Sequence, residues 1–329
     1  MRFDMSESRK IRQINLPGNP FSTSGAWYKG SPHNHTTASD GRCGVSELAT
    51  WYQNQGIDFV VFTDHDAVAD VSEAAHLSVL SIPGAEVGVC WDGAFGAELL
   101  CLGITEIRRK GATPQQVIDD TLAQGGLPYV SHPYLSGVHS ALMNDLEGLI
   151  GIEVYNAAAG GLCNRAMATV HLNELIAMGK PVWALASGDR HSTRRPLQAW
   201  VEVRAGRLDQ ESILEAMRNG YYYSTTGPRI HDISVNETHV SVKCSEAQQI
   251  TFSSLPWLSK TVIAGKNEPI TEASVPLDVI GSTQKIEETV QWLMDNRRLT
   301  VRKDLKPVVR IEIADAAGKF AWSNPIPIP

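Results

Sequence analysis

The sequence has few cysteines, no long apolar run and no run of basic residues, and each absence excludes a class of protein. Its five cysteines are scattered and none is spaced as CxxC, which argues against a disulfide scaffold and a structural zinc finger. No apolar stretch is long enough to span a bilayer, and the opening residues lack the apolar core of a secretion signal. The formal net charge of −7, with no cluster of Lys and Arg, argues against a basic surface for nucleic-acid binding. These absences predict a protein of the reducing cytoplasm.

Between about residues 27 and 228 the sequence alternates short apolar runs with helix-like segments. The clearest strand is 57–62, which is nearly all apolar, as expected of a strand covered on both faces. A cap followed by proline, Thr113-Pro114, opens a helix that Gly125-Gly126 closes. Further segments are helices 46–53, with Ser46 as cap, 164–178 and 209–219, and strands 127–130, 151–155 and 182–186. Repeated β–α units predict a parallel sheet, open or closed into a barrel.

From about residue 230 the pattern changes to short alternating strands. Residues 233–242 alternate around Asn236-Glu237 as in a hairpin, and 308–313 alternate before a turn at 315–318. A helix is expected at 283–294 between them. We therefore predict an α/β barrel-like domain over residues 1–229 and a small, mostly β domain over 230–329 that packs on it.

Residues that bind metals follow the predicted strands, at the point where each strand ends. They are His33 and His35 after segment 27–30, Asp40 just beyond, Asp64, His65 and Asp66 after residue 62, Glu86 after 82–85, His132 after residue 130, and Asp189 and His191 after residue 186. In parallel α/β folds the carboxyl ends of the strands form one shared rim. Five segments would thus deliver imidazoles and carboxylates to one place.

The spacing of these residues suits a metal site. Two His spaced as HxH on an extended segment point to the same side, and Asp189 and His191 share that spacing. Mixed imidazole and carboxylate ligation favours zinc, manganese or iron over calcium or magnesium. Without Asp64 and Asp66, eight candidate ligands remain: His33, His35, Asp40, His65, Glu86, His132, Asp189 and His191. Eight exceed the needs of one ion, so we expect two or three ions, with Glu86 as a bridge.

Taken singly, each residue has a plainer explanation. His132 alone fits an ordinary rim histidine, Asp40 a turn residue before Gly41, and Glu86 a rim carboxylate. Asp64 suits a role in orienting His65 rather than ligation. The histidines without a strand-end position are His76, His139, His171, His231 and His239. The joint position of the eight, which core packing alone would not produce, favours the metal site.

In this order the motifs resemble the PHP (polymerase and histidinol phosphatase) superfamily. They are HNH (33–35), SDG (39–41), TDHD (63–66), GAE (84–86), SHP (131–133) and GDRH (188–191). The match runs from about residue 27 to 191. The segments WYKGSPHNHTTASDG, GIEVYNA, STTGP and AWSNPI resemble the carbaryl-hydrolase-like (CehA/McbA) branch, and this resemblance extends through the C-terminal region.

The resemblance implies a distorted (β/α)7 TIM-like barrel with a trinuclear site that hydrolyses phosphoesters. His33, His35, Glu86 and Asp189 would hold the first ion, Glu86 and His132 the second, and Asp40, His65 and His191 the third. A metal-bound hydroxide, held through Glu86 and Asp189, would attack the ester, because bound water falls from a pKa of ~15.7 to near ~7.

The sequence departs from the family pattern at two places. Many relatives give the second ion a further His or Cys after the strand at 151–155, where this chain offers Asn156, Cys163 or Glu153. Arg190 lies between two predicted ligands, where it could bind a substrate phosphate or form a salt bridge with Glu153 or Asp66. Arg165 is a second candidate for anion binding, with a helix-surface role as its alternative.

The sequence therefore predicts a metal-dependent hydrolase of phosphoesters, acting on a phosphorylated small molecule with two or three ions of zinc, manganese or iron. One alternative keeps the metal site but hydrolyses a carbamate, carboxylic ester or amide. A second alternative is a non-enzymatic scaffold, against which the intact ligand set argues.

Overall fold

The computed structural model describes residues 19–94, 96–109, 111–255, 257–266, 268–297 and 307–329. The opening segment, on which the expectation about a secretion signal rests, lies outside these residues. Within them, no helix is long and apolar enough to cross a membrane.

Strands dominate the described chain. Fourteen of them form one continuous sheet in the order β13-β12-β15-β16-β9-β8-β1-β2-β3-β4-β5-β6-β7, with β17 paired to β15. Their bounds are β1 Ala26–Ser31, β2 Phe59–Phe62, β3 Leu80–Gly88, β4 Glu98–Leu102, β5 Leu127–Val130, β6 Gly151–Asn156, β7 Trp183–Ser187, β8 Trp200–Ala205, β9 Tyr222–Thr225, β12 Gln249–Ser253, β13 Lys260–Ile263, β15 Val308–Ala314, β16 Phe320–Ser323 and β17 Ile326–Pro327. A second sheet has the order β10-β11-β14, over Ile230–Val235, His239–Ala247 and Ile270–Pro276.

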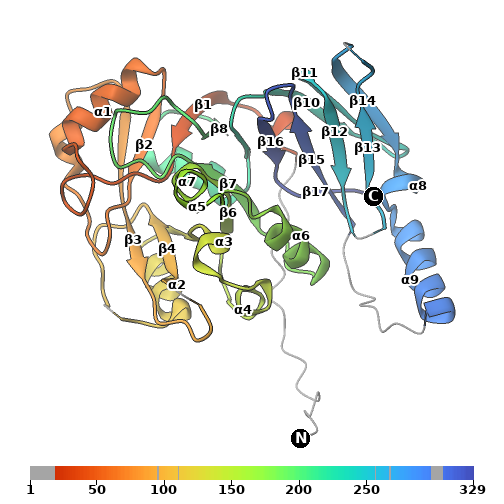
Figure 1. Ribbon diagram of the computed structural model, residues 1–329, viewed down its shortest axis with the longest axis horizontal. Coiled ribbons are helices and arrows are strands. Elements are labelled where there is room, and N and C mark those ends of the chain that lie inside the picture. The colour runs from red at the N-terminus through yellow and green to blue at the C-terminus, as the bar shows by residue number, and fades with distance from the viewer. Residues whose placement is uncertain (1–18, 95, 110, 256, 267, 298–306) are drawn as a thin grey trace, which may run out of the picture.

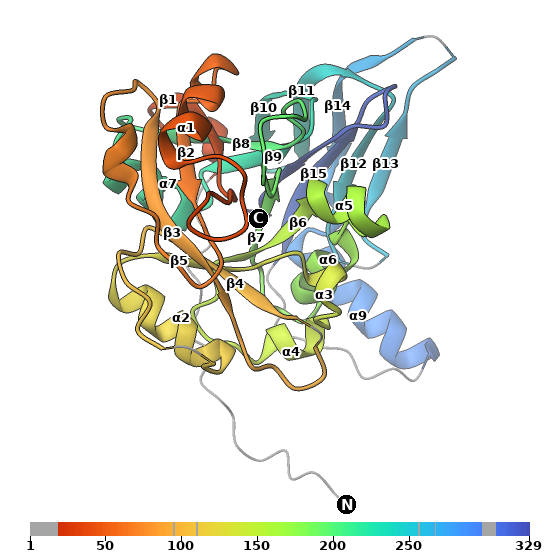
Figure 2. The ribbon, with the colours of Figure 1, turned by 60° about the vertical axis from the view of Figure 1, so that its left-hand side comes forward.

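The helices lie between the strands. They are α1 Val45–Asn54, α2 Pro114–Ala123, α3 Pro133–Ser136, α4 Ser140–Asn144, α5 Ala157–Cys163, α6 Thr169–Ala177, α7 Gln210–Arg218, α8 Leu277–Ile280 and α9 Thr283–Arg297. Figures 1 and 2 place β10–β14 at the opposite end of the molecule from β2 and β3, with α3, α4 and α6 between the two ends.

Most elements agree with the sequence, and the exceptions have local causes. The predicted start of α2 at Thr113-Pro114 is confirmed, and the structure adds a capping box, in which the side chains of Thr113 and Gln116 each accept from the other's backbone N–H. Helix α1 begins after Gly44 rather than at Ser46, and no side chain caps it. The single helix expected at 164–178 is wrong, because Asn164 ends α5 in the left-handed conformation (φ 60°) and α6 begins only at Thr169.

The closed (β/α)7 barrel is not confirmed. The described sheet runs as an open ladder from β13 to β7, and β3 pairs with β4, β4 with β5, and β1 with β8 in antiparallel fashion. The β3–β4 pair is a hairpin, which replaces a helical crossover with a direct turn. The fold is therefore a mixed α/β arrangement with a large sheet.

Near the predicted site, however, the two ends of the β1–β7 portion meet. Chain just beyond β1 and chain just beyond β7 form one parallel bridge between Asn34 and Arg190. Around it, His35 N donates to Arg190 O (2.9 Å) and Arg42 N donates to His191 O (2.9 Å). These contacts bring the segments with HNH and GDRH side by side, as the carboxyl-end rim requires.

The C-terminal strands have the predicted hairpin. Strands β10 and β11 pair antiparallel with Val235 opposite Val240, and β15 pairs with β16 across the turn at 315–318. Across the predicted boundary at residue 230, β16 is hydrogen-bonded to β9. The division into two domains stays a prediction.

Candidate metal centre

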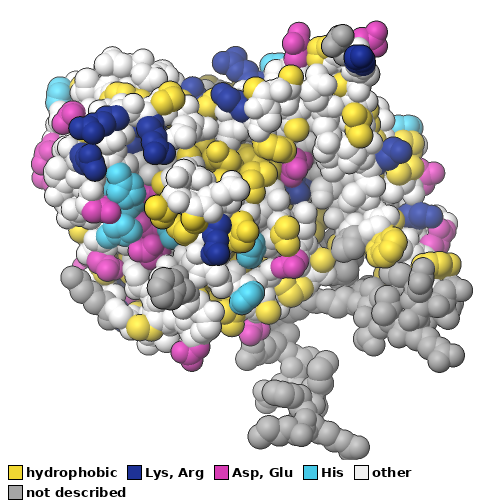
Figure 3. Space-filling view, in the orientation of Figure 1, with side chains coloured by type: hydrophobic (Ala, Val, Ile, Leu, Met, Phe, Trp, Pro, Cys, Tyr) yellow, Lys and Arg dark blue, Asp and Glu magenta, His cyan; other side chains and the backbone are white. Residues whose placement is uncertain are grey.

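All eight predicted ligands gather beyond the ends of β1, β2, β5 and β7 and on β3. His33 and His35 are fully buried, Glu86 is 1% exposed and Asp189 8%. Figure 3 shows histidine side chains reaching the surface among acidic ones, with Lys and Arg side chains close by. The centre thus has a buried interior and an open side.

The innermost group contains His33, His35 and Asp189, whose ligand atoms lie within 4.8 Å of one another. Nε2 of His33 lies 3.0 Å from Nε2 of His35, and Oδ1 of Asp189 lies 3.1 Å from the same atom of His35. Oε2 of Glu86 is 3.1 Å from His33 Nε2 and 3.3 Å from His35 Nε2. These are the four residues that the resemblance assigns to the first ion.

A second group lies on the open side and contains His35, Asp40, His65 and His191. Asp40 Oδ2 lies 3.3 Å from His191 Nε2 and 3.8 Å from His65 Nε2, and Asp40 is 57% exposed. The three residues assigned to the third ion are thus neighbours, and this group is the one nearest to solvent.

The third group adds a carboxylate that the sequence analysis does not include. His65, Glu86 and Glu98 offer ligand atoms within 4.8 Å of one another. Glu98 opens β4, and its Oε2 lies 3.4 Å from Nε2 of His132, while Glu86 Oε1 lies 3.1 Å from that nitrogen. The apolar run ELLCL could have indicated the strand, but no sequence signal placed it next to Glu86.

Glu153, a sequence candidate for ligation of the second ion, hydrogen-bonds to two predicted ligands, His33 and His132. Its Oε1 accepts a hydrogen bond from His33 Nδ1 (2.9 Å), and its Oε2 accepts from the backbone N–H of His132 (2.8 Å) and from Asn156 (2.9 Å). A carboxylate on the outer nitrogen fixes the tautomer and orientation of an imidazole. Glu153 therefore aims His33 Nε2 into the site.

Asp64 does not orient His65 as expected. Its carboxylate accepts hydrogen bonds from the backbone and hydroxyl of Thr36 (2.7 and 2.8 Å) and from the hydroxyl of Ser39 (2.6 Å). Asp64 thereby ties down the loop that carries Asp40. Asp66, named as a salt-bridge partner for Arg190, instead accepts from the N–H of Gly88 (3.1 Å).

Two predicted ligands adopt backbone conformations that are rare outside glycine. His132 has φ 25° and Asp189 has φ 46°. Such conformations cost about 1–3 kcal/mol each and concentrate at functional sites. Hydrogen bonds at both residues, from His132 N to Glu153 and from Asn156 Nδ2 to Asp189 Oδ2 (3.2 Å), help to hold them.

The pKa values of the imidazoles and carboxylates at the centre are shifted in opposite directions by their mutual contacts. Burial by itself lowers the pKa of His132, but its hydrogen bonds to Glu86 and Glu98 outweigh burial and raise the pKa to about 11. For His35 burial is likewise outweighed, by hydrogen bonds to Asp189 and Glu86, and its pKa is raised to about 9. Burial raises the pKa of Glu86, yet the charge of His33 and the neighbouring imidazoles hold it well below its usual value. A divalent cation bound here would offset the same negative charge, and its binding would release any protons held by the ligating imidazoles.

The donor set fits divalent metal ions. Among the described residues, three buried atoms at the centre make no well-directed hydrogen bond: Nδ1 of His35, Oε1 of Glu86 and Oδ1 of Asp189. The two oxygens each lie 3.1 Å from an imidazole nitrogen that could instead share a cation with them. Unpartnered buried polar atoms are costly unless something else satisfies them. Imidazole nitrogens mixed with carboxylate oxygens are the ligands of zinc, manganese and iron. Clustered His, Asp and Glu residues therefore support binding of divalent metal.

A cleft of about 860 Å³ opens onto the centre. Its lining includes His65, Glu86, Glu98, His132, Asp189 and His191, together with Arg42, Arg190, Arg194, Arg195, Leu135 and Leu162. It has the size of a small-molecule site.

Arg190 and Arg165 have structural contacts in this fold. Arg190 Nη1 donates to the carbonyls of Ser192 (2.8 Å) and Arg195 (3.0 Å), Nη2 donates to Pro196 (2.7 Å), and the guanidinium lies 4.0 Å from the ring centre of Trp51. This arrangement supports a structural role, although not the suggested salt bridge. Arg165 donates to a backbone carbonyl at 3.5 Å and lies over the ring of Tyr134. Their role in substrate binding stays a prediction.

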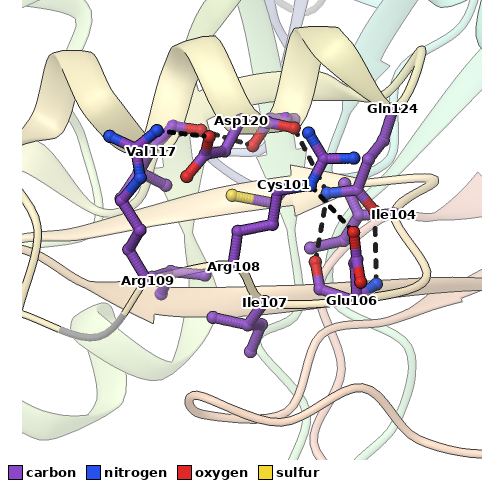
Figure 4. A pocket seen from close by; sticks show the side chains of 11 residues that line it. Cys101, Ile104, Glu106, Ile107, Arg108, Arg109, Val117, Asp120 and Gln124 are labelled. Atoms are coloured by element: carbon purple, nitrogen blue, oxygen red, sulfur yellow. Dashed lines mark hydrogen bonds and ion pairs between the residues drawn. The ribbon is translucent and has the colours of Figure 1, made fainter.

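A second hollow lies between α2 and the segment after β4 (Figure 4). Its volume is only about 10 Å³, which is room for a single water molecule. Ion pairs of Arg109 with Asp120 (3.1 Å) and Arg108 with Glu106 (2.8 Å) surround it. It offers no space for a substrate.

Comparison with known proteins identifies likenesses but no family. No known family model matches the chain. An uncharacterised protein of Methanocaldococcus jannaschii, MJ1587, is 33% identical over 112 residues, which are 32% of this chain and 61% of that protein. A two-domain protein from Bacteroides vulgatus, described as containing a predicted PHP-like metal-dependent phosphoesterase, is similar with a TM-score of 0.49 and 15% identity over 97% of this chain and 100% of its own. A sulfate-bound, metal-free amidohydrolase from Chromobacterium violaceum is similar with a TM-score of 0.41 and 15% identity over 51% of this chain and 89% of its own.

Proposed function

We propose that this protein is a metal-dependent hydrolase of phosphoesters, of the PHP superfamily and its carbaryl-hydrolase-like branch. The observation that carries the proposal is the convergence of eight sequence-predicted ligands, five of which line one cleft. Four arginines line the same cleft: Arg42, Arg190, Arg194 and Arg195. Buried carboxylates with unpartnered oxygens are poor packing elements but good metal ligands.

Two or three divalent ions of zinc, manganese or iron would be held by the three groups of ligands. When bound, such ions polarise an ester and supply an activated water near neutral pH. Glu86 touches all three groups, so its carboxylate is placed to bridge ions. Glu153 orients His33, and Asp64 orients the loop of Asp40.

The cleft chemistry favours an anionic substrate. Arg42, Arg194 and Arg195 are exposed and line the cleft that leads to the ligands. Guanidinium groups bind phosphate oxygens by paired hydrogen bonds. We infer that these three, rather than Arg190 and Arg165, contact the phosphorylated part of the substrate.

The test combines metal analysis with a substrate screen. Purified protein incubated with manganese, iron or zinc should contain two or three ions per chain by elemental analysis, and His33→Ala should contain fewer. The loaded protein should hydrolyse phosphomonoesters or phosphodiesters, and His33→Ala and Asp189→Ala should lose turnover while keeping a wild-type circular dichroism spectrum. A protein that binds no metal under these conditions would sink the proposal.

A neutral ester, carbamate or amide is the rival substrate class. Leu135, Ala158 and Leu162 give the cleft an apolar wall, which suits an uncharged aromatic or aliphatic group. Replacing Arg42 and Arg194 together by Ala separates the two classes. A phosphoesterase should lose at least ~10-fold in kcat/KM, since charge-assisted hydrogen bonds contribute about 1.5–3 kcal/mol each, whereas a neutral-ester hydrolase should change little.

A further inference from the structure

We propose that Glu98 is a metal ligand, supplying the protein donor for the second ion that the strand at 151–156 does not supply. The inference rests on the proposed function and adds a residue outside the motifs that suggested it. With Glu98, the second ion would have three protein ligands: Glu86, Glu98 and His132.

The geometry around His132 is the first support. Ser136 Oγ lies 2.9 Å from Nδ1 of His132, which leaves Nε2 as the ligating nitrogen. That nitrogen faces Glu86 Oε1 at 3.1 Å and Glu98 Oε2 at 3.4 Å. Two carboxylate oxygens of different residues and one imidazole nitrogen thus converge around one point.

The other oxygen of Glu98 has a different task. Oε1 lies 3.1 Å from Nδ1 of His65, whose Nε2 faces Asp40 in the solvent-side group. A carboxylate on the outer nitrogen of a ligating imidazole holds its tautomer. Glu98 can therefore ligate one ion through Oε2 and orient the ligand of another through Oε1.

The fold explains why Glu98 is available. Strands β3 and β4 pair antiparallel with Glu86 opposite Leu100, so Glu98, two residues before Leu100, projects from the same face as Glu86. The carbonyl of Glu98 also accepts from the N–H of Ser131 (3.1 Å), which fixes it beside the segment of His132. In the expected all-parallel arrangement β4 would not bring its first residue to this rim. The candidates on and after β6 are engaged in other contacts. Glu153 accepts hydrogen bonds from His33 and from the backbone of His132. The Asn156 side chain caps α5 and donates to Glu153 and Asp189, and Cys163 is exposed.

Glu98→Gln tests the proposal, because it removes the charge and one ligating oxygen with little change in shape. The control is Glu246→Gln, an exposed glutamate in β11 that makes the same chemical change far from the site. After loading with manganese, elemental analysis and calorimetric titration should show one ion fewer than wild type, or one ion bound at least ~10-fold more weakly, the loss typical even for outer partners of ligands. The control should match wild type.

Diffraction from manganese-loaded crystals gives a second, activity-independent measurement. In wild type the anomalous signal should include an ion about 2.0–2.2 Å from an oxygen of Glu98, beside Glu86 and His132. In Glu98→Gln that peak should weaken or vanish while the peak between His33, His35 and Asp189 remains. Wild-type metal content together with wild-type affinities in the variant, or a wild-type ion beside Glu86 with Glu98 out of reach, would overturn this inference and leave the proposed function intact. A wild-type protein without metal would overturn both.

Discussion

At the scale of single residues, the buried carboxylate of Glu153 is a sensitive point of the centre. It accepts hydrogen bonds from His33, the backbone of His132, Asn156 and Ser187 while being 1% exposed. Glu153→Gln replaces one carboxylate oxygen, a hydrogen-bond acceptor, by an NH2 group, which is a donor. Because the partners of Glu153 are themselves donors, the new buried N–H would face another donor. We expect metal affinity to fall ~10–100-fold and unfolding free energy to fall by about 1–3 kcal/mol.

Metal titration and chemical denaturation measure the two effects of Glu153→Gln, again with Glu246→Gln as the control. Unchanged affinity with reduced stability would show that Glu153 serves packing alone. A loss in affinity that Glu153→Asp partly restores would support the orienting role.

Arg190 poses a second residue-scale question, because its guanidinium holds the backbone of Ser192, Arg195 and Pro196. Lysine keeps the charge but cannot make this fork of hydrogen bonds or stack in the same way on Trp51. We expect Arg190→Lys to lower the melting temperature and to reduce turnover of anionic and neutral esters alike. A selective rise in KM for phosphoesters, with unchanged melting temperature, would instead identify Arg190 as a substrate-binding residue.

At the scale of elements, α5 shapes the cleft through its small residues. A Cβ at Gly161 would lie 2.7 Å from Nη1 of Arg195, the far end of a flexible side chain. Gly161→Ala should therefore displace the guanidinium while raising helix propensity by up to ~1 kcal/mol. We expect unchanged or slightly higher stability together with a raised KM for phosphoesters.

Steady-state kinetics with a phosphoester and thermal unfolding check the Gly161→Ala prediction. Gly44→Ala is a control, since a Cβ there meets no atom within 4 Å. If KM for the phosphoester stays at the wild-type value in Gly161→Ala, Arg195 has no part in substrate binding.

At the scale of the whole molecule, the clustered charges make the stability of the metal-free protein depend on pH. Hydrogen bonds to carboxylates outweigh burial and raise the pKa of His35 to about 9 and the pKa of His132 to about 11, against a pKa of ~6.5 in an unfolded chain. The protonated imidazoles therefore stabilise the folded protein fully below a pH of ~6.5. This stabilisation is lost as the pH rises through the pKa values that the two histidines have in the folded protein. Asp189, Glu86 and Glu98 are the carboxylates that face them.

We therefore expect the melting temperature of metal-free protein to fall between pH 7 and pH 10. Metal affinity should rise over the same range, because ligation displaces the protons from the imidazoles. Differential scanning fluorimetry in chelator, and titrations in buffers of different ionisation enthalpy, measure the two trends. A melting temperature that rises with pH would contradict the protonated state of these imidazoles.

The order of strands and helices along the chain, and most of the predicted ligands, follow from local chemistry. Strand β2 is apolar throughout because both of its faces are covered, and α2 begins at Thr113-Pro114 because that pair satisfies the free N–H groups of the first turn. HxH spacing and strand-end placement singled out the ligands, since both depend on local geometry that a few residues determine.

Long-range pairing decided the rest. Whether β4 runs parallel or antiparallel to β3 depends on how the sheet buries it, so Glu98 could not be placed from its neighbours in sequence. The choice of Glu153, Asp64 and Arg190 as orienting and structural groups likewise depends on partners distant in the chain. The sequence by itself determined which side chains can bind metal, because this is a property of residue type and spacing. Only the tertiary structure decided which of them lie close enough to share an ion, because that depends on distances that the packing of the sheet sets.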